Sequence, residues 1–154
     1  VLIGVSAPHV FENVLGVLNQ KPIIFAMSNP EPEVRPEIAK KIRPDCIIAT
    51  GRSDYPNQIN NVLAFPGVFR GALDKRAAEI SEDMKIAAAE AIAELVTDDL
   101  SAEYIIPDPF DQRVVPAVAS AVARSAVENN LAQIKLSSQE LENKIQEKLK
   151  GLNK

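Results

Sequence analysis

The first third of the chain contains three short apolar runs rich in Ile and Val: VLIGV at 1–5, PIIFAM at 22–27 and CIIAT at 46–50. Runs of this length, with β-branched residues and prolines nearby, are typical of strands buried on both faces of a parallel sheet. Between them the pattern predicts helices at 11–19 and 36–42. Pro36 would stand in the first turn of the second helix, where its missing N–H costs little. The order β-α-β-α-β predicts right-handed crossovers in a doubly wound α/β sheet.

The second half of the chain has the spacing of helices, which we expect over 65–76, 82–96 and 114–129. Ser81 precedes two acidic residues and is the expected N-cap of the second of these helices. Gly67 and Gly71 are four residues apart, a spacing that more often marks close helix packing than a binding loop. Ser137 and Glu140 have the spacing of a capping box and predict a last, amphipathic helix.

Small or polar residues and then a proline follow each of the three predicted strands. The segments are Ser6-Ala7-Pro8, Ser28-Asn29-Pro30 and the longer stretch GRSDYP at 51–56. In open α/β sheets, ligands bind beyond the carboxyl ends of the strands, where these loops would meet. Amide side chains there could bind a carboxylate or a hydroxyl, because an amide both donates and accepts and stays neutral. We therefore expect a site for a small polar ligand at this edge.

Structural roles compete with this interpretation at several positions. Asn29 could be a turn residue, because Asn-Pro is a common turn element. The adjacent Asn60 and Asn61 favour a functional role more strongly, since they border an apolar run where buried amides would need partners. Arg52 and Asp54 could pair with each other or cap a turn. His9, the only histidine, is expected to be a polar residue at a helix start.

Composition narrows the class of protein further. The 154 residues are 46% apolar and 25% charged, as in ordinary globular domains. The net charge of −4 provides no basic field, which argues against nucleic acid and membrane surfaces as partners. The single Cys46 excludes an internal disulfide and fits a reducing cytosol, where it would pack as a small hydrophobe. We expect a cytoplasmic protein, and a chain that belongs to a longer one because a strand opens it.

Four segments, taken in order, resemble the carboxyl-terminal half of a malic enzyme of the short prokaryotic type: IGVSAP, IIFAMSNPEPE, IIATGRSDYPNQINNVLAFPGVFRGALD and YIIPDPFDQRVVPAVA. The resemblance implies a fold class: a Rossmann-like parallel sheet, the second half of such a domain, followed by carboxyl-terminal helices. It implies a partial NAD(P)-binding domain over 1–132, with 133–154 left as a hinge and an amphipathic helix. It also implies metal-dependent oxidative decarboxylation of L-malate to pyruvate and CO2, with reduction of NAD or NADP.

The same resemblance implies roles for individual residues. Ser6, Ala7 and Asn29 match positions that bind the cofactor, and Asn29, Asn60 and Asn61 match positions that bind the substrate. The family's catalytic Tyr and Lys, its phosphate-binding glycine loop and its acidic ligands for Mg or Mn have no match in this sequence and are expected upstream. No catalytic or metal-binding residue is therefore assigned, and the isolated chain is expected to be inactive.

The expected partners follow from the resemblance and from the unpaired strand at 1–5. They are L-malate and pyruvate, the missing amino-terminal half or a companion chain, and further copies in a homo-oligomer. A different class of function stays open, because fold does not fix function. In that alternative the chain is a non-catalytic α/β module for binding or assembly.

Overall fold

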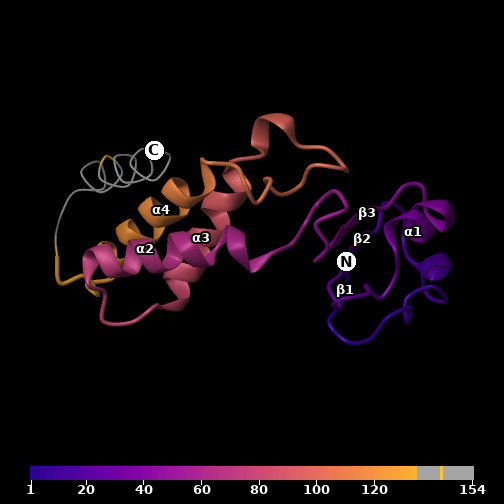
Figure 1. Cartoon of the computed structure of the whole chain (residues 1–154), viewed down its shortest axis with the longest axis horizontal. Coiled ribbons are helices and arrows are strands. Elements are labelled where there is room, and N and C mark those ends of the chain that lie inside the picture. Colours follow the sequence, from indigo (N-terminus) through magenta and orange to yellow (C-terminus); the bar gives the residue numbers. More distant parts are fainter. Residues whose placement is uncertain (135–142, 144–154) are drawn as a thin grey trace. The chain divides into compact units, whose positions relative to one another are not determined.

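The computed structural model of the chain describes residues 1–134 and Asn143. They form two compact units, each built from two segments of the sequence (Figure 1). The first unit contains residues 1–60 and 98–108, and the second contains residues 61–97 and those from 109 onward. Apart from Asn143, the predicted last helix lies outside the described residues.

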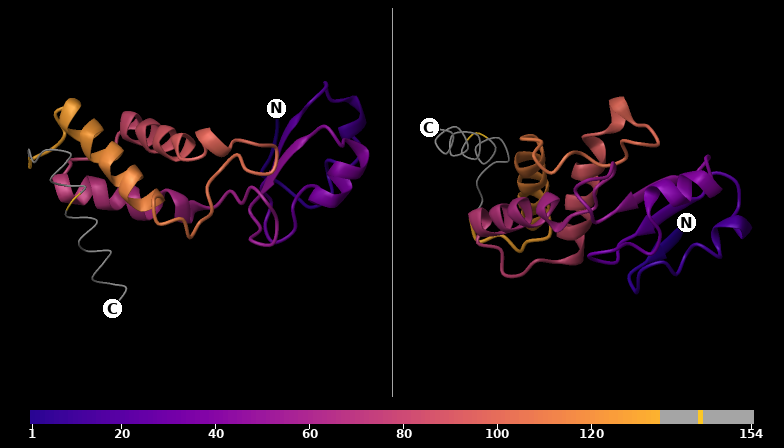
Figure 2. Two further views of the ribbon diagram at one scale, coloured as in Figure 1. Left: turned by 90° about the horizontal axis from the view of Figure 1, so that it is seen from above. Right: turned by 45° about the vertical axis from the view of Figure 1, so that its right-hand side comes forward.

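The first unit is built on a three-stranded parallel sheet in the order β1-β2-β3, as labelled in Figure 1. Figure 2 shows the two units from two further sides. The strands of the sheet are β1 (Leu2–Gly4), β2 (Ile23–Ala26) and β3 (Ile47–Thr50). Leu2 is paired with Ile24, which in turn is paired with Ile48. The three predicted strands and their parallel pairing are confirmed.

The core of the first unit lies under β2 and β3 and includes Leu15, Ile24, Val34 and Ile48. The prediction that all strands are buried on both faces is wrong for β1. Ile3 in this strand is 59% exposed. Within the described residues β1 has a strand neighbour on one side only, so part of its surface stays uncovered.

The helix predicted at 11–19 is wrong. The structure has only a short 3-10 turn there, η1 (Leu15–Val17). Asn13, Val14 and Gly16 are weak helix formers. The apolar residues whose spacing suggested a helix reach the core without one. Leu15 is fully buried in the core, and Phe11 and Leu18 pack against it. The second predicted helix is confirmed as α1 (Pro36–Ile42), with its proline in the first turn.

Three helices form the second unit, as the sequence predicts: α2 (Phe65–Lys75), α3 (Glu82–Glu94) and α4 (Val114–Glu128). Short 3-10 turns stand at η2 (Asn61–Leu63) and η3 (Thr97–Asp99). The hydroxyl of Ser81 caps α3 by accepting the N–H of Met84 at 3.3 Å. No helix of the described residues is both long enough and apolar enough to cross a membrane.

Gly67 and Gly71 set the contact between α2 and α4. A Cβ on Gly67 would lie 2.6 Å from the Cβ of Val118, and one on Gly71 would lie 2.5 Å from the carbonyl oxygen of Ala119. Real Cβ atoms do not approach other atoms so closely, so the two helices pack at a distance that only glycine permits. The predicted close packing at this pair is confirmed.

Candidate functional site

The loops that follow the three strands lie at the carboxyl edge of one sheet, because all three strands are parallel. Ser6 and Ala7 follow β1, and Ser28 and Asn29 follow β2. Ser6, Ala7 and Asn29 are all exposed, and a cis peptide bond joins Asn29 to Pro30. Three of the predicted site residues therefore lie at the edge where the sequence predicts a ligand.

A buried carboxylate holds the first two of these loops. Glu33 is 0% exposed. Its Oε1 accepts the backbone N–H of Ser6 at 2.8 Å, and its Oε2 accepts the backbone N–H of Ser28 at 2.9 Å. Sequence reasoning missed this residue. The available signal was an acid placed directly before Val34, a residue of the buried core.

Gly4 makes room for this carboxylate at the end of β1. A Cβ on Gly4 would lie 2.5 Å from Cδ of Glu33 and 2.5 Å from Cζ of Phe11. Any larger residue would push the Glu33 side chain or the aromatic ring out of place. The last residue of β1 is therefore a glycine for reasons of space.

The loop after β3 is held by ion pairs. The Arg52 guanidinium donates to both carboxylate oxygens of Asp54, at 2.8 and 2.7 Å, and to Glu31 at 3.0 Å. The hydrogen bond from Arg52 lowers the pKa of Asp54. Desolvation, followed by the hydrogen bond to Glu37, raises the pKa of Tyr55. The simpler interpretation, in which Arg52 and Asp54 pair with each other, is confirmed.

Asn57, one of the amides that follow β3, has a structural role. It is 5% exposed and has a positive φ of 56°, a conformation that Asn tolerates. Its Nδ2 donates to the carbonyl oxygens of Ile48 at 3.0 Å and Ala102 at 2.9 Å. Its Oδ1 accepts the N–H of Ile105 at 2.9 Å. Asn57 therefore joins β3 to the segment 98–108.

The other two predicted amides stand at the division between the units. Asn60 is the last residue of the first segment of unit one, and Asn61 opens unit two. Both are exposed, and the carbonyl oxygen of Asn61 accepts the N–H of Ala64 at 3.1 Å in the turn η2. The predicted substrate-binding amides thus belong to different units of the chain.

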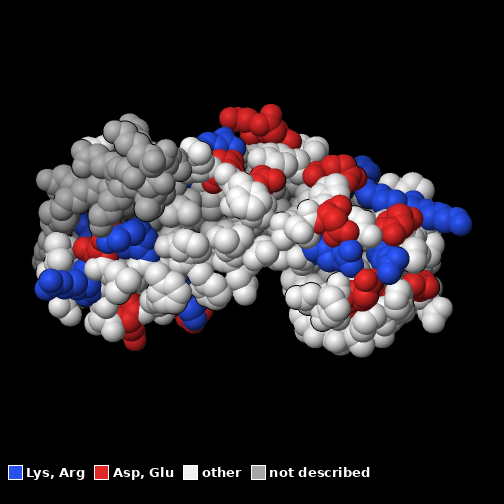
Figure 3. Space-filling model, viewed as in Figure 1, with Lys and Arg blue, Asp and Glu red and all other residues white. Residues whose placement is uncertain are grey.

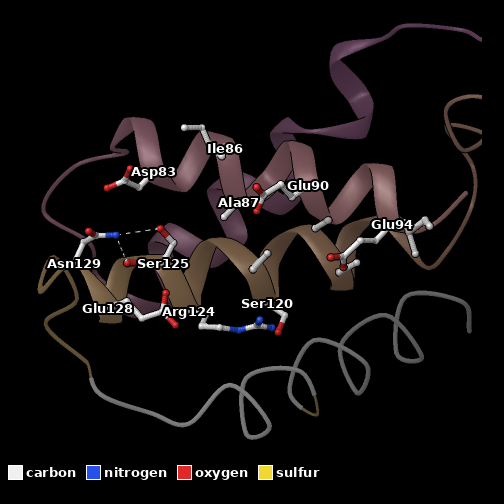
Figure 4. A pocket seen from close by; sticks show the side chains of 14 residues that line it. Asp83, Ile86, Ala87, Glu90, Glu94, Ser120, Arg124, Ser125, Glu128 and Asn129 are labelled. Carbon is white, nitrogen blue, oxygen red and sulfur yellow. Dashed lines mark hydrogen bonds between the residues drawn. The ribbon is translucent and has the colours of Figure 1, made fainter. Parts of the chain in front are cut away.

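A hollow of about 680 Å³ lies between α3 and α4 (Figure 4). Its walls carry the acidic side chains of Asp83, Glu90 and Glu94 and the guanidinium of Arg124. None of Ser6, Ala7, Asn29, Asn60 or Asn61 lines it. Among residues 1–134, no group of three or more His, Cys, Asp or Glu is arranged to hold a metal ion.

The parallel sheet with polar loops at its carboxyl edge defines a Rossmann-like α/β domain, the class that binds nicotinamide nucleotides. Within that class, the chain belongs to the malic enzyme family. The family model described as "Malic enzyme, NAD binding domain" matches residues 1–127.

Relatives and solved structures agree with this assignment. The chain is 56% identical over 146 residues to a bifunctional malic/malolactic enzyme of Bacillus subtilis, a match that covers 94% of this chain and 35% of that protein. It is 49% identical over 148 residues to an NADP-dependent malic enzyme of Escherichia coli, covering 86% of this chain and 20% of the relative. The crystal structure of malic enzyme from Pyrococcus horikoshii matches with a TM-score of 0.84 at 45% identity, covering 92% of this chain and 32% of that one. The chain therefore spans about a third or less of the proteins it resembles.

Proposed function

We propose that this chain supplies the edge of a malic enzyme that binds the nicotinamide and the substrate. The complete enzyme would convert L-malate to pyruvate and CO2 and reduce NAD or NADP. One observation carries the proposal: in a chain of this family, the loops containing Ser6, Ala7 and Asn29 end at the carboxyl edge of a parallel sheet. That edge is where open α/β sheets bind their ligands.

The roles of the individual residues follow from their chemistry. Ser6, Ala7 and Asn29 would contact the nicotinamide end of the cofactor, which supplies the acceptor for the hydride that leaves C2 of malate. Ser6 offers a hydroxyl and Asn29 a carboxamide, and both residues are exposed. These groups fit the carboxamide of a nicotinamide, because they can donate to its oxygen and accept from its nitrogen.

Substrate binding would be shared by Asn29, Asn60 and Asn61. A neutral amide can donate to a malate carboxylate without placing a positive charge beside the ring that accepts the hydride. The contribution of these side chains is orientation, since a substrate aligned for reaction avoids much of the entropic cost of the step. No residue of this chain is assigned as the acid or base of the reaction.

The described residues do not fit the divalent metal of this proposal, Mg or Mn, because they contain no cluster of ligands for it. We infer that its ligands come from the part of the enzyme outside this sequence, and we assign no step to them here. Whether NAD or NADP is preferred is left open by the proposal. A cytoplasmic location is inferred from the free, buried thiol of Cys46.

Partners for the assembled protein are inferred from uncovered apolar surface. Val1 and Val5, which flank β1, are 84% and 77% exposed. On α2, Phe69 and Leu73 are 50% and 69% exposed. Charged side chains are sparse over the middle of the second unit on the face that Figure 3 draws. Surface of this kind marks sites of association. We propose that the remaining part of the enzyme, and further copies in a homo-oligomer, cover it.

The test compares the chain alone with an enzyme completed by the remaining malic enzyme sequence. With malate, Mn²⁺ or Mg²⁺ and either dinucleotide, the completed enzyme should form NAD(P)H and pyruvate, and residues 1–154 alone should form neither. A completed, folded enzyme that leaves malate unchanged would favour the alternative, a non-catalytic module. Activity of the isolated chain would contradict the assignment of the acid, the base and the metal ligands to another segment.

A further inference from the structure

Glu33 joins two loops at equivalent positions of neighbouring strands. Gly4 and Ala26 are paired as the last residues of β1 and β2. The N–H groups that Glu33 accepts belong to Ser6 and Ser28, each two residues beyond its strand. The carboxylate therefore continues the link between the two strands beyond the last paired residues.

The geometry of this link is tightly determined. Each carboxylate oxygen accepts one N–H, so the separation of the two oxygens fixes the separation of the two loops. The side chain is fully buried, so water does not compete for either oxygen. The backbone of Glu33 is also held, because its carbonyl oxygen accepts the N–H of Phe11 at 3.2 Å.

One of the residues fixed in this way, Ser6, is itself a predicted cofactor contact and precedes another, Ala7. The second, Ser28, directly precedes the predicted contact Asn29. A shift of either loop would move a group that is proposed to face the nicotinamide or the substrate. Such displacements reduce rates strongly, since reacting atoms must be held close to their final geometry.

We propose that Glu33 is a positioning residue that sets the spacing of the two ligand loops through the backbone N–H groups of Ser6 and Ser28. Gly4 supports this positioning, because it leaves the space that the carboxylate of Glu33 occupies. The proposal rests on the function proposed above for these loops. It assigns no contact between Glu33 and substrate or cofactor.

The first experiment measures the kinetics of the completed enzyme with Glu33→Gln. The glutamine is nearly isosteric, but its NH2 group replaces one acceptor and would face an N–H. We expect kcat/KM for malate to fall about ten- to a hundredfold, with a higher KM for the dinucleotide. Gly4→Ala should act in the same direction, because its methyl group displaces the carboxylate. Glu33→Asp keeps the charge with a shorter reach and should lose less activity than Glu33→Gln.

Val34→Ala is the matched control for stability. Val34 is adjacent in sequence and 0% exposed in the same core, but its side chain has no polar group to hold the loops. This variant should lower the melting temperature and leave kcat/KM per folded molecule within about twofold of the parent. If Val34→Ala lost as much kcat/KM per folded molecule as Glu33→Gln, the proposal would be overturned.

Hydrogen exchange supplies a readout that does not depend on activity. In Glu33→Gln the backbone amides of Ser6 or Ser28 should exchange at least about tenfold faster, because their acceptor is lost. In Val34→Ala these two amides should keep their protection relative to the rest of the sheet. Unchanged exchange at both serines in Glu33→Gln, or kcat/KM that stays at the parent value, would refute the positioning role. If the parent enzyme does not oxidise malate, the proposed function fails, and exchange at the two serines still decides whether Glu33 fixes the loops.

Discussion

Asn57, Asn60 and Asn61 differ in burial although they lie within five residues of one another. Asn57 is buried and satisfies two carbonyl groups and one N–H of its own unit. Asn60 and Asn61 are exposed. The sequence does not show which of these amides is buried. The burial of Asn57 depends on the segment 98–108, which is distant in sequence and supplies two of its hydrogen-bond partners.

Replacing Asn57 should therefore affect stability and not kinetics. Asn57→Ala removes the side-chain partner of three backbone groups, among them the carbonyl oxygen of the buried Ile48, and should lower the free energy of unfolding by about 1–3 kcal/mol. Asn57→Asp keeps the acceptor for Ile105 but loses both donated bonds, so it should also be destabilised. Chemical denaturation of the completed enzyme, together with malate kinetics, checks this. A variant of normal stability with a raised KM for malate would instead make Asn57 a ligand contact.

At the scale of elements, the predictions succeeded where apolar spacing and end signals agreed. α1, α2, α3 and α4 each begin within one residue of the predicted start, and proline or Ser81 marks three of these starts. The helix at 11–19 failed because its apolar spacing serves the core without a helix, and its residues have weak helix propensity. Local pattern alone does not distinguish these two cases.

The α2–α4 contact provides a test at this scale. Gly71→Ala places a methyl group against the backbone of Ala119, which has no room to move unless the two helices separate. We expect a loss of about 1–3 kcal/mol in the free energy of unfolding, as for other overpacked interiors. Gly16→Ala is the control, because nothing lies within 4 Å of a Cβ at that position. Equal unfolding midpoints for both variants would contradict the proposed packing.

A second test concerns the turn between α1 and β3. Hydrogen bonds from the Arg43 side chain, and then from the N–H of Lys21, lower the pKa of Asp45 from 3.8 to about 2. The unfolded chain thus binds the proton more readily, so this contribution to stability is present above pH 3.8 and is lost as the pH falls towards 2. The stability difference between the parent and Asp45→Asn should accordingly shrink over that interval. Melting temperatures across the interval measure it, and a constant difference would refute the assigned interaction.

At the scale of the whole molecule, the chain forms two units and passes from one to the other after Asn60, Thr97 and Asp108. The sequence carries no proline or glycine linker between Asn60 and Asn61, so composition does not reveal the first of these passages. The boundary predicted after residue 132 stays a prediction. The meeting of these loops at one edge was predictable from the sequence, because parallel topology alone brings the loops after β1 and β2 to the same edge. Glu33 was not, because its partners are backbone groups of strand ends that lie 27 and 5 residues away.

The proposed function assigns different roles to the amides Asn29 and Asn61, and variants of the two residues should therefore behave differently. Asn61→Ala should then raise KM for malate and lower kcat while leaving KM for the dinucleotide nearly unchanged. Asn29→Ala should weaken the dinucleotide as well, because its loop follows β2 at the edge proposed for the nicotinamide.

The most direct test is the kinetics of Asn61→Ala in the completed enzyme, measured together with its melting temperature. A lost hydrogen bond to a carboxylate costs about 1.5–3 kcal/mol, so kcat/KM for malate should fall about ten- to a hundredfold at an unchanged melting temperature. If Asn61→Ala instead melts early and converts malate at the parental rate per folded molecule, Asn61 is a turn residue of η2 and the assigned substrate site is wrong.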